Sequence, residues 1–275
     1  MPNLFHLPQY ERHLSLAALA HCPRHYQYVD QLRAGVLSDA PTKESLLLGI
    51  LVHVGVRALW TQKQAGQDWL PSVAFDAMDG TSELTGALAC DGPAMLALAK
   101  RAVGAYAAQW TGARDHWKPL LVEPLDVPPL PAMVVEDEFV AYPDLITTAL
   151  PLYGVLVVDY KTSYYKFEAA KWEWHPELLT QCLAAQQLQP NDAIFYQIDY
   201  LQRPSKQSTV WSFPATPVWE FTPRKAAVAR EWILNGLRRR NWHRQHYPDQ
   251  PWPQEISQCQ TPWGMCEHYE RCFGD

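Results

Sequence analysis

Two carboxylates and a lysine stand at the ends of two neighbouring apolar runs. Asp144 follows "FVAYP", and "GVLVVDYKTS" carries Asp159 and Lys161 near its end. Side chains alternate along a strand, so Asp159 and Lys161 point to the same face. On adjacent strands the two carboxylates would meet at one edge of the sheet, and such paired oxygen ligands suit Mg²⁺ or Mn²⁺. A lysine beside them can orient or deprotonate a water, so the pattern indicates metal-assisted phosphodiester hydrolysis. An isolated Asp-x-Lys is more often a plain ion pair.

The elements that must position these groups follow from periodicity and from helix and turn signals. Apolar residues at helical spacing predict helices, and runs rich in valine, leucine and aromatics predict strands. A stretch rich in Gly, Asp, Ser and Thr predicts a loop over 66–92, with at most a short helical turn. Thr222 followed by Pro223 predicts the start of the last helix. The predicted helices are 15–32, 42–64, 93–110, 176–188 and 223–247, and the predicted strands fall within 119–129, 132–150, 154–162, 192–202 and 207–216.

Length and composition indicate one α/β domain that can bury a full core. The chain has 275 residues, 48% hydrophobic and 19% charged, with a net charge of −6. We expect a single domain over 1–275, with a helical N-terminal part (1–115), a sheet core (116–215) and a basic helix with a cysteine tail (216–275). We expect no signal peptide and no membrane span, and therefore a cytoplasmic protein.

Three of the six cysteines cluster near the C-terminal end, at Cys259, Cys266 and Cys272. In the reducing cytoplasm such a group suggests a metal site more than disulfides. With Cys22 as a fourth thiolate, the set fits Zn²⁺ or a [4Fe–4S] cluster. No Cys-x(2–4)-Cys pair occurs among the four, which favours the cluster over structural zinc.

The last predicted helix is rich in basic residues with tryptophans interleaved. Charge that neutralises phosphates, together with rings that stack on bases, is what a single-strand track requires. A helix face exposed to solvent gives the same pattern of residues, and both interpretations stay open. The candidate nucleic-acid-binding residues are Arg224, Lys225, Arg238, Arg239 and Arg240.

These motifs in this order resemble the RecB-type branch of the PD-(D/E)XK nuclease superfamily. The resemblance is carried by "LGILVH" ending at His53, by Pro143-Asp144, by "DYKTS" and by Gln181. It implies a restriction-endonuclease-like core, a mixed sheet flanked by helices. It also implies a divalent metal held by His53, Asp144, Asp159 and the Tyr160 carbonyl, with Lys161 acting on the water and Glu123 and Gln181 supporting the site. The family's Gln-x-x-x-Tyr motif is incomplete, because Ala185 stands in the tyrosine position.

Iron–sulfur members of this branch carry one cysteine before the nuclease core and three after it. They include AddB-type helicase-nucleases and CRISPR-adaptation nucleases. The resemblance therefore implies that Cys22, Cys259, Cys266 and Cys272 hold a [4Fe–4S] cluster. It further implies a DNA exonuclease acting on single strands or free ends in CRISPR adaptation, phage recombination or repair, with protein partners from those systems.

Three other functions stay open at this stage. The same fold could be a structure-specific or nicking endonuclease. It could also serve as a DNA-binding subunit that does not cut, which the missing tyrosine would suit but the intact Asp, Asp and Lys would not. An iron–sulfur redox protein would need cofactor sites that the sequence does not reveal.

Overall fold

The protein is described from a computed structural model. It describes residues 11–12, 16, 19, 22–23, 27, 44–84, 92–122, 130–133, 139–148, 153–204, 210–248, 250–252, 260–261 and 264–265.

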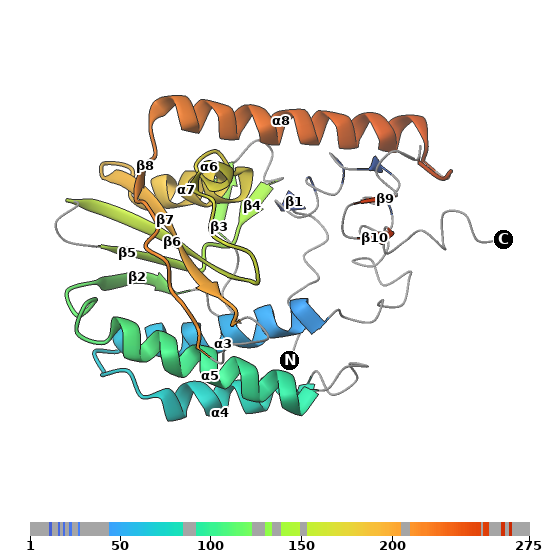
Figure 1. Ribbon diagram of the computed structural model, residues 1–275. Coiled ribbons are helices and arrows are strands. Elements are labelled where there is room, and N and C mark those ends of the chain that lie inside the picture. Colours follow the sequence, from blue (N-terminus) through green and yellow to red (C-terminus); the bar gives the residue numbers. More distant parts are fainter. Residues whose placement is uncertain are drawn as a thin grey trace.

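A five-stranded mixed sheet forms the centre of the described fold (Figure 1). Its order is β2 (Lys118–Val122), β5 (Leu145–Thr148), β6 (Gly154–Ser163), β7 (Ala193–Gln202) and β8 (Trp219–Glu220). All neighbours are antiparallel except β6 and β7, which run parallel over ten residue pairs. A parallel pair needs a crossover connection, and here α7 (Pro176–Leu188) supplies it after the single turn of α6 (Ala169–Trp172).

Helices cover both faces of this sheet, as Figure 1 shows. On one face lie α3 (Glu44–Gln64), α4 (Pro71–Leu84) and α5 (Gly92–Trp110), and on the other lie α7 and α8 (Pro223–His246). Alternation along β6 sends Val155 and Val157 into the core shared with α7, and Leu156 and Val158 into the core shared with α3 and α5. This confirms the predicted α/β class with a mixed sheet between helices and a helical N-terminal region.

Two smaller sheets complete the described elements. Strands β1 (Glu11–Arg12), β4 (Phe139–Ala141) and β3 (Leu130–Met133) form the first, with β1 parallel and β3 antiparallel to β4. The second is the pair β9 (Gln260–Thr261) and β10 (Gly264–Met265). Strand β4 leads into β5 through Pro143 and Asp144, so this corner places the first carboxylate.

The long predicted helices are confirmed, including the start of α8. The Thr222 side chain accepts a hydrogen bond from the backbone N–H of Lys225 and Pro223 follows it, as the N-cap prediction requires. The prediction for 15–32 falls mostly outside the described residues.

The predicted loop over 66–92 was wrong for its central part, which forms helix α4. Ala74 and Met78 lie one turn apart and are both fully buried in the core with α3 and α5. Gly, Asp, Ser and Thr disfavour a helix only weakly, and this burial overrides that preference.

The strand predicted within 207–216 was also wrong. In the described part of that stretch, a single bridge joins Ser212 to Gln202. The strand that pairs with β7 lies later, at Trp219–Glu220, just before α8.

An added methyl group is expected to have opposite effects on stability at two of the glycines. A Cβ at Gly154 would overlap the carbonyl oxygen of Ala193, where β6 and β7 begin their pairing. None of the described residues lies within 4 Å of a Cβ at Gly80, on the exposed side of α4. We therefore expect Gly154→Ala to destabilise the protein by about 1–3 kcal/mol and Gly80→Ala to stabilise it by about 0.5–1 kcal/mol. Urea denaturation measures both, and equal effects would contradict the close strand approach.

Candidate active site

The structure brings together His53, Asp144, Asp159, Tyr160, Lys161 and Gln181, which lie far apart in the sequence. Asp144 precedes β5, whereas Asp159 and Lys161 lie on the neighbouring strand β6. Asp144 accepts a hydrogen bond from the backbone N–H of Tyr160 through Oδ2 at 2.8 Å. This bond ties the corner before β5 to β6, so Asp144 lies beside the strand that carries Asp159.

Helix α7 completes the polar cluster from one face of the sheet. Gln181 donates through Nε2 to Asp159 Oδ1 at 3.0 Å, and its own Oε1 is buried without a hydrogen-bond partner among the described residues. Lys161 Nζ lies 2.9 Å from Asp159 Oδ2 and 3.1 Å from Glu177 Oε2. The lysine therefore bridges a strand carboxylate and a helix carboxylate.

His53 reaches the same place from α3. Its Nδ1 lies 3.5 Å from Asp144 Oδ1, and its Nε2 lies 2.6 Å from the carbonyl oxygen of Tyr160. The ring also meets the Tyr160 ring edge-on. The imidazole thus contacts both a carboxylate and the backbone carbonyl that the sequence grouped with it.

Burial and neighbouring charges set the protonation of the cluster. Burial alone would lower the pKa of His53, but the Asp144 carboxylate outweighs it and raises that pKa to about 9. Burial also opposes the ionised form of Asp144, yet His53 and Lys161 lower its pKa below the ordinary value. For Asp159, burial together with the charge of Asp144 outweighs the effect of Lys161 and raises the pKa. The two carboxylates are therefore inequivalent, as paired acid groups in active sites often are.

The donors present have the chemistry of a divalent-metal site. In the described part of the chain, no three His, Cys, Asp or Glu side chains lie close enough to enclose a metal ion by themselves. The donor atoms of the candidate site are of several types. The carbonyl of Tyr160 lies beside His53 and Asp144, and the carboxylate of Asp159 is held by Lys161 and Gln181. Carboxylate, carbonyl and imidazole donors suit Mg²⁺ or Mn²⁺.

Comparison with known proteins decides the family. The sequence profile of the PD-(D/E)XK nuclease superfamily matches residues 13–273. The chain belongs to the PD-(D/E)XK nuclease superfamily. Nucleic acid is therefore its substrate class. A search of curated proteins gives no significant match.

Solved structures share the fold of this chain. Eight chains match significantly, among them a Eubacterium rectale protein described as a "Putative exonuclease". It shares 10% identity with this chain at a TM-score of 0.51, and the match covers 86% of this chain and 82% of that one. Identity this low supports a common fold.

Several predicted residues of this PD-(D/E)XK nuclease lie outside the described residues. They are Glu123 and three of the four proposed cluster ligands, Cys259, Cys266 and Cys272. Cys22 is described and is buried, with 6% of its surface exposed.

Ala185, in the position of the family's tyrosine, is fully buried in the core between α7 and the sheet. A tyrosine ring would not fit there without displacing neighbouring side chains. Gln181, one turn earlier, therefore contacts Asp159 without the aromatic partner that the family pattern includes.

Glu177 is the site residue that the sequence analysis missed. It lies one helical turn before Gln181, so both side chains project from the same side of α7 toward β6. The spacing of one helical turn between Glu177 and Gln181 was the signal in the sequence that could have identified Glu177. A glutamate in the first turn of a helix is also common for reasons unrelated to catalysis.

The basic residues of α8 do not form one continuous surface. Arg224, Arg238 and Arg239 are exposed, whereas Lys225 and Arg240 are 5% and 4% exposed. The Lys225 ammonium donates to the carbonyl of Glu220 and lies 3.3 Å from a Glu173 carboxylate oxygen. Two of the five predicted contacts thus turn inward, because they lie on the side of α8 that carries its buried apolar residues.

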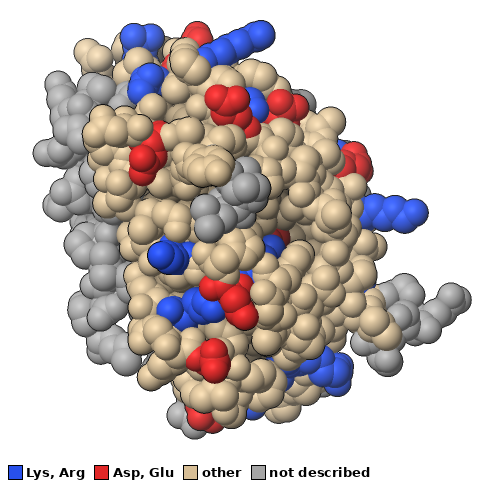
Figure 2. Space-filling model, turned by 90° about the vertical axis from the view of Figure 1, so that its left-hand side faces the viewer, with Lys and Arg blue, Asp and Glu red and all other residues tan. Residues whose placement is uncertain are grey.

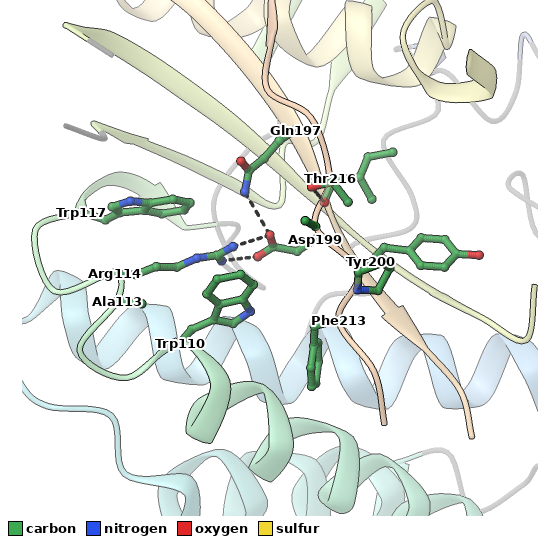
Figure 3. A pocket seen from close by; sticks show the side chains of 12 residues that line it. Trp110, Ala113, Arg114, Trp117, Gln197, Asp199, Tyr200, Phe213 and Thr216 are labelled. Carbon is green, nitrogen blue, oxygen red and sulfur yellow. Dashed lines mark hydrogen bonds and ion pairs between the residues drawn. The ribbon is translucent and has the colours of Figure 1, made fainter. Parts of the chain in front are cut away.

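A pocket of about 230 Å³ lies elsewhere, between the end of α5, β7 and the segment before β8 (Figure 3). Its wall includes the buried pair of Arg114 and Asp199, with Arg114 between the rings of Trp110 and Trp117. The pocket contains none of the predicted site residues. Gln197 and Asp199 line it from the face of β7 opposite to α7, whereas Asp159 and Lys161 of the candidate active site face α7.

Proposed function

We propose that this PD-(D/E)XK protein is a metal-dependent DNA exonuclease that hydrolyses phosphodiester bonds on single strands or DNA ends. One observation carries the proposal: Lys161, Asp159 and Gln181 form a hydrogen-bonded group next to the His53–Asp144 pair. Such ends arise in recombination, repair and CRISPR adaptation, and the proteins of such a system are the proposed partners. Among the described residues, no helix could cross a membrane.

The proposed metal ligands are His53, Asp144, Asp159 and the carbonyl of Tyr160. When bound, Mg²⁺ or Mn²⁺ would supply charge neutralisation on the phosphate and a more acidic water. The buried hydrogen bond from Tyr160 N–H holds Asp144, and Gln181 holds Asp159. Glu123 is proposed as a further supporting acid.

Lys161 acts in this proposal as a cation that positions the water and the phosphate. Burial would lower its pKa, but Asp159 and Glu177 more than reverse this and raise it above the ordinary lysine value. An ammonium held this firmly is a poor base. Its three N–H groups can instead stabilise negative charge that builds on the phosphate during hydrolysis.

Substrate topology tests the exonuclease proposal against an endonuclease. With Mn²⁺, we expect the protein to digest a labelled linear single strand and to leave a covalently closed circular strand of the same sequence intact. Cleavage of the circle would favour a nicking or structure-specific endonuclease. Tight binding with no cleavage of either substrate would favour a subunit that does not cut.

We also propose that Cys22, Cys259, Cys266 and Cys272 hold a [4Fe–4S] cluster, with Zn²⁺ as the alternative. Support comes from the contact between the segment of Cys22 and the residues after α8. Gln27 donates to the carbonyl of Gln250 at 2.9 Å and accepts from the N–H of Trp252 at 3.0 Å. Leu19 packs with Trp252 and Tyr247 in a small apolar cluster.

An anaerobic preparation tests the cluster separately from the nuclease. We expect visible absorption that disappears in air, about four irons per chain, and loss of both in Cys22→Ser. A colourless protein with one zinc would overturn the cluster and would leave the nuclease proposal intact.

A further inference from the structure

The connection between β6 and α7 exposes aromatic rings just after Lys161. Tyr164 is 58% exposed and Tyr165 is 60% exposed. Tyrosines tolerate water through their hydroxyl groups, so exposure alone has an ordinary explanation. The position and the neighbours of these two rings distinguish them.

Arg203 lies over the ring of Tyr164, with its guanidinium carbon 3.7 Å from the ring centroid. This residue directly follows β7, whose carboxyl end lies beside that of β6. The flat cation and the ring therefore form one composite surface from two neighbouring strand ends.

The backbone that carries the two tyrosines is held in place. The N–H of Tyr165 donates to Ser163 Oγ at 3.1 Å, and the carbonyl of Tyr165 accepts from the Tyr200 hydroxyl at 2.8 Å. The N–H of Arg203 donates to the carbonyl of Ser163 at 2.7 Å. These bonds fix the backbone that carries the rings before any ligand arrives, which lowers the entropic cost of binding.

This surface lies next to the candidate active site on the same side of the sheet. Ser163 is two residues after Lys161 and shares its face of β6, about 7 Å further along the strand. Tyr200, which holds the Tyr165 carbonyl, packs in the core with α7, the helix that supplies Gln181 and Glu177. Ligands of sheets with parallel strands commonly bind at such carboxyl ends.

We propose that Tyr164, Tyr165 and Arg203 form a stacking platform that binds unpaired nucleotides of a single-stranded DNA substrate beside Lys161. Exposed rings bind the faces of bases regardless of sequence, and arginine adds a contact to phosphate or base. Bases inside a duplex are stacked on one another and cannot stack on such rings. The platform therefore selects single strands, and this inference rests on the proposed nuclease function.

The face drawn in Figure 2, which views the molecule from the end where β6 begins, and helix α8 are the two other surfaces compared with the platform. On the face drawn in Figure 2, Lys and Arg side chains of the described residues are interspersed with Asp and Glu. On α8, Lys225 and Arg240 are buried. Stacking next to the site supplies binding energy that a scattered surface of mixed charge does not.

Binding to metal-free protein tests the platform without cleavage. In EDTA, the affinity for a fluorescein-labelled oligothymidine is measured by anisotropy for wild type, Tyr164→Ala/Tyr165→Ala and Tyr164→Phe/Tyr165→Phe. The alanine pair should bind at least about fivefold more weakly, because each stacked base contributes to affinity, and the phenylalanine pair should bind within about twofold of wild type. Arg203→Gln should reduce the salt dependence of binding by about one phosphate contact.

Tyr153→Ala is the matched control, because that tyrosine is 89% exposed and lies before the opposite end of β6. It should bind as wild type does. An alanine pair with wild-type affinity and an unchanged melting temperature would overturn the platform, even if wild type digests linear strands. Weakened binding in the alanine pair, with no cleavage by wild type in Mn²⁺, would support the platform and overturn the nuclease proposal.

Discussion

Alanine in place of Lys161 is expected to lower the rate of DNA cleavage by at least about 10²–10³-fold, the usual cost of removing one group that stabilises transition-state charge. The ammonium is held between Asp159 and Glu177, so no other described cation occupies its place. Asp159→Asn should lose activity as severely, because it removes a proposed metal ligand while keeping the shape of the side chain. Single-turnover digestion of a labelled strand measures both variants.

A surface lysine gives the matched control. Lys171 is 69% exposed at its side chain and forms an ion pair with Glu168 across one turn. Lys171→Ala should retain wild-type cleavage, since exposed pairs of this kind contribute little. Full activity in folded Lys161→Ala or Asp159→Asn would remove the basis for the proposed active site.

Arg114→Ala is expected to destabilise the fold by about 3–5 kcal/mol, the usual cost of breaking a buried ion pair. Arg114 binds both carboxylate oxygens of Asp199, with Nη2 2.6 Å from Oδ1, and also donates to the Tyr106 hydroxyl at 2.9 Å. That hydroxyl donates to Asp199 at 2.7 Å. Removing the arginine leaves a carboxylate that is 5% exposed without its cation.

Urea denaturation of Arg114→Ala should be compared with Lys100→Ala. Lys100 lies 2.6 Å from Asp79, but its partner is half-exposed, so its loss should cost less than about 1 kcal/mol. The double variant Arg114→Met/Asp199→Leu should be more stable than Arg114→Ala, because no charge stays buried. Equal losses for Arg114→Ala and Lys100→Ala would contradict the burial argument.

The sequence predicted the elements whose signals are local. Helix α8 begins at a Thr-Pro pair that specifies an N-terminus by itself, and β6 is a continuous apolar run. Helix α4 was missed because its stability comes from burying Ala74 and Met78 against α3 and α5. No short window of sequence contains that partner surface.

The same distinction separates the parts of the candidate site. The motifs that can be recognised in order along the chain are those of His53, Asp144, Asp159, Lys161 and Gln181. The structure places these residues in one cluster. Glu177 could not be recognised in the sequence, because it matters through Lys161 on another element. The same holds outside the candidate site for Arg114, which matters through Asp199. Which cations of α8 face inward also depends on packing against other elements, and for that reason Lys225 and Arg240 were predicted to contact nucleic acid although they are buried.

The contact of Gln27 with Trp252 has a consequence for synthesis on the ribosome. The two residues are 225 positions apart, so the early segment must wait for nearly the whole chain to be made. At about 5–20 residues per second, that wait is roughly 10–45 s. During that time Leu19 lacks Tyr247 and Trp252, the residues that later pack against it. A nascent chain of this protein should therefore depend on chaperones that hold its first thirty or so residues until translation ends.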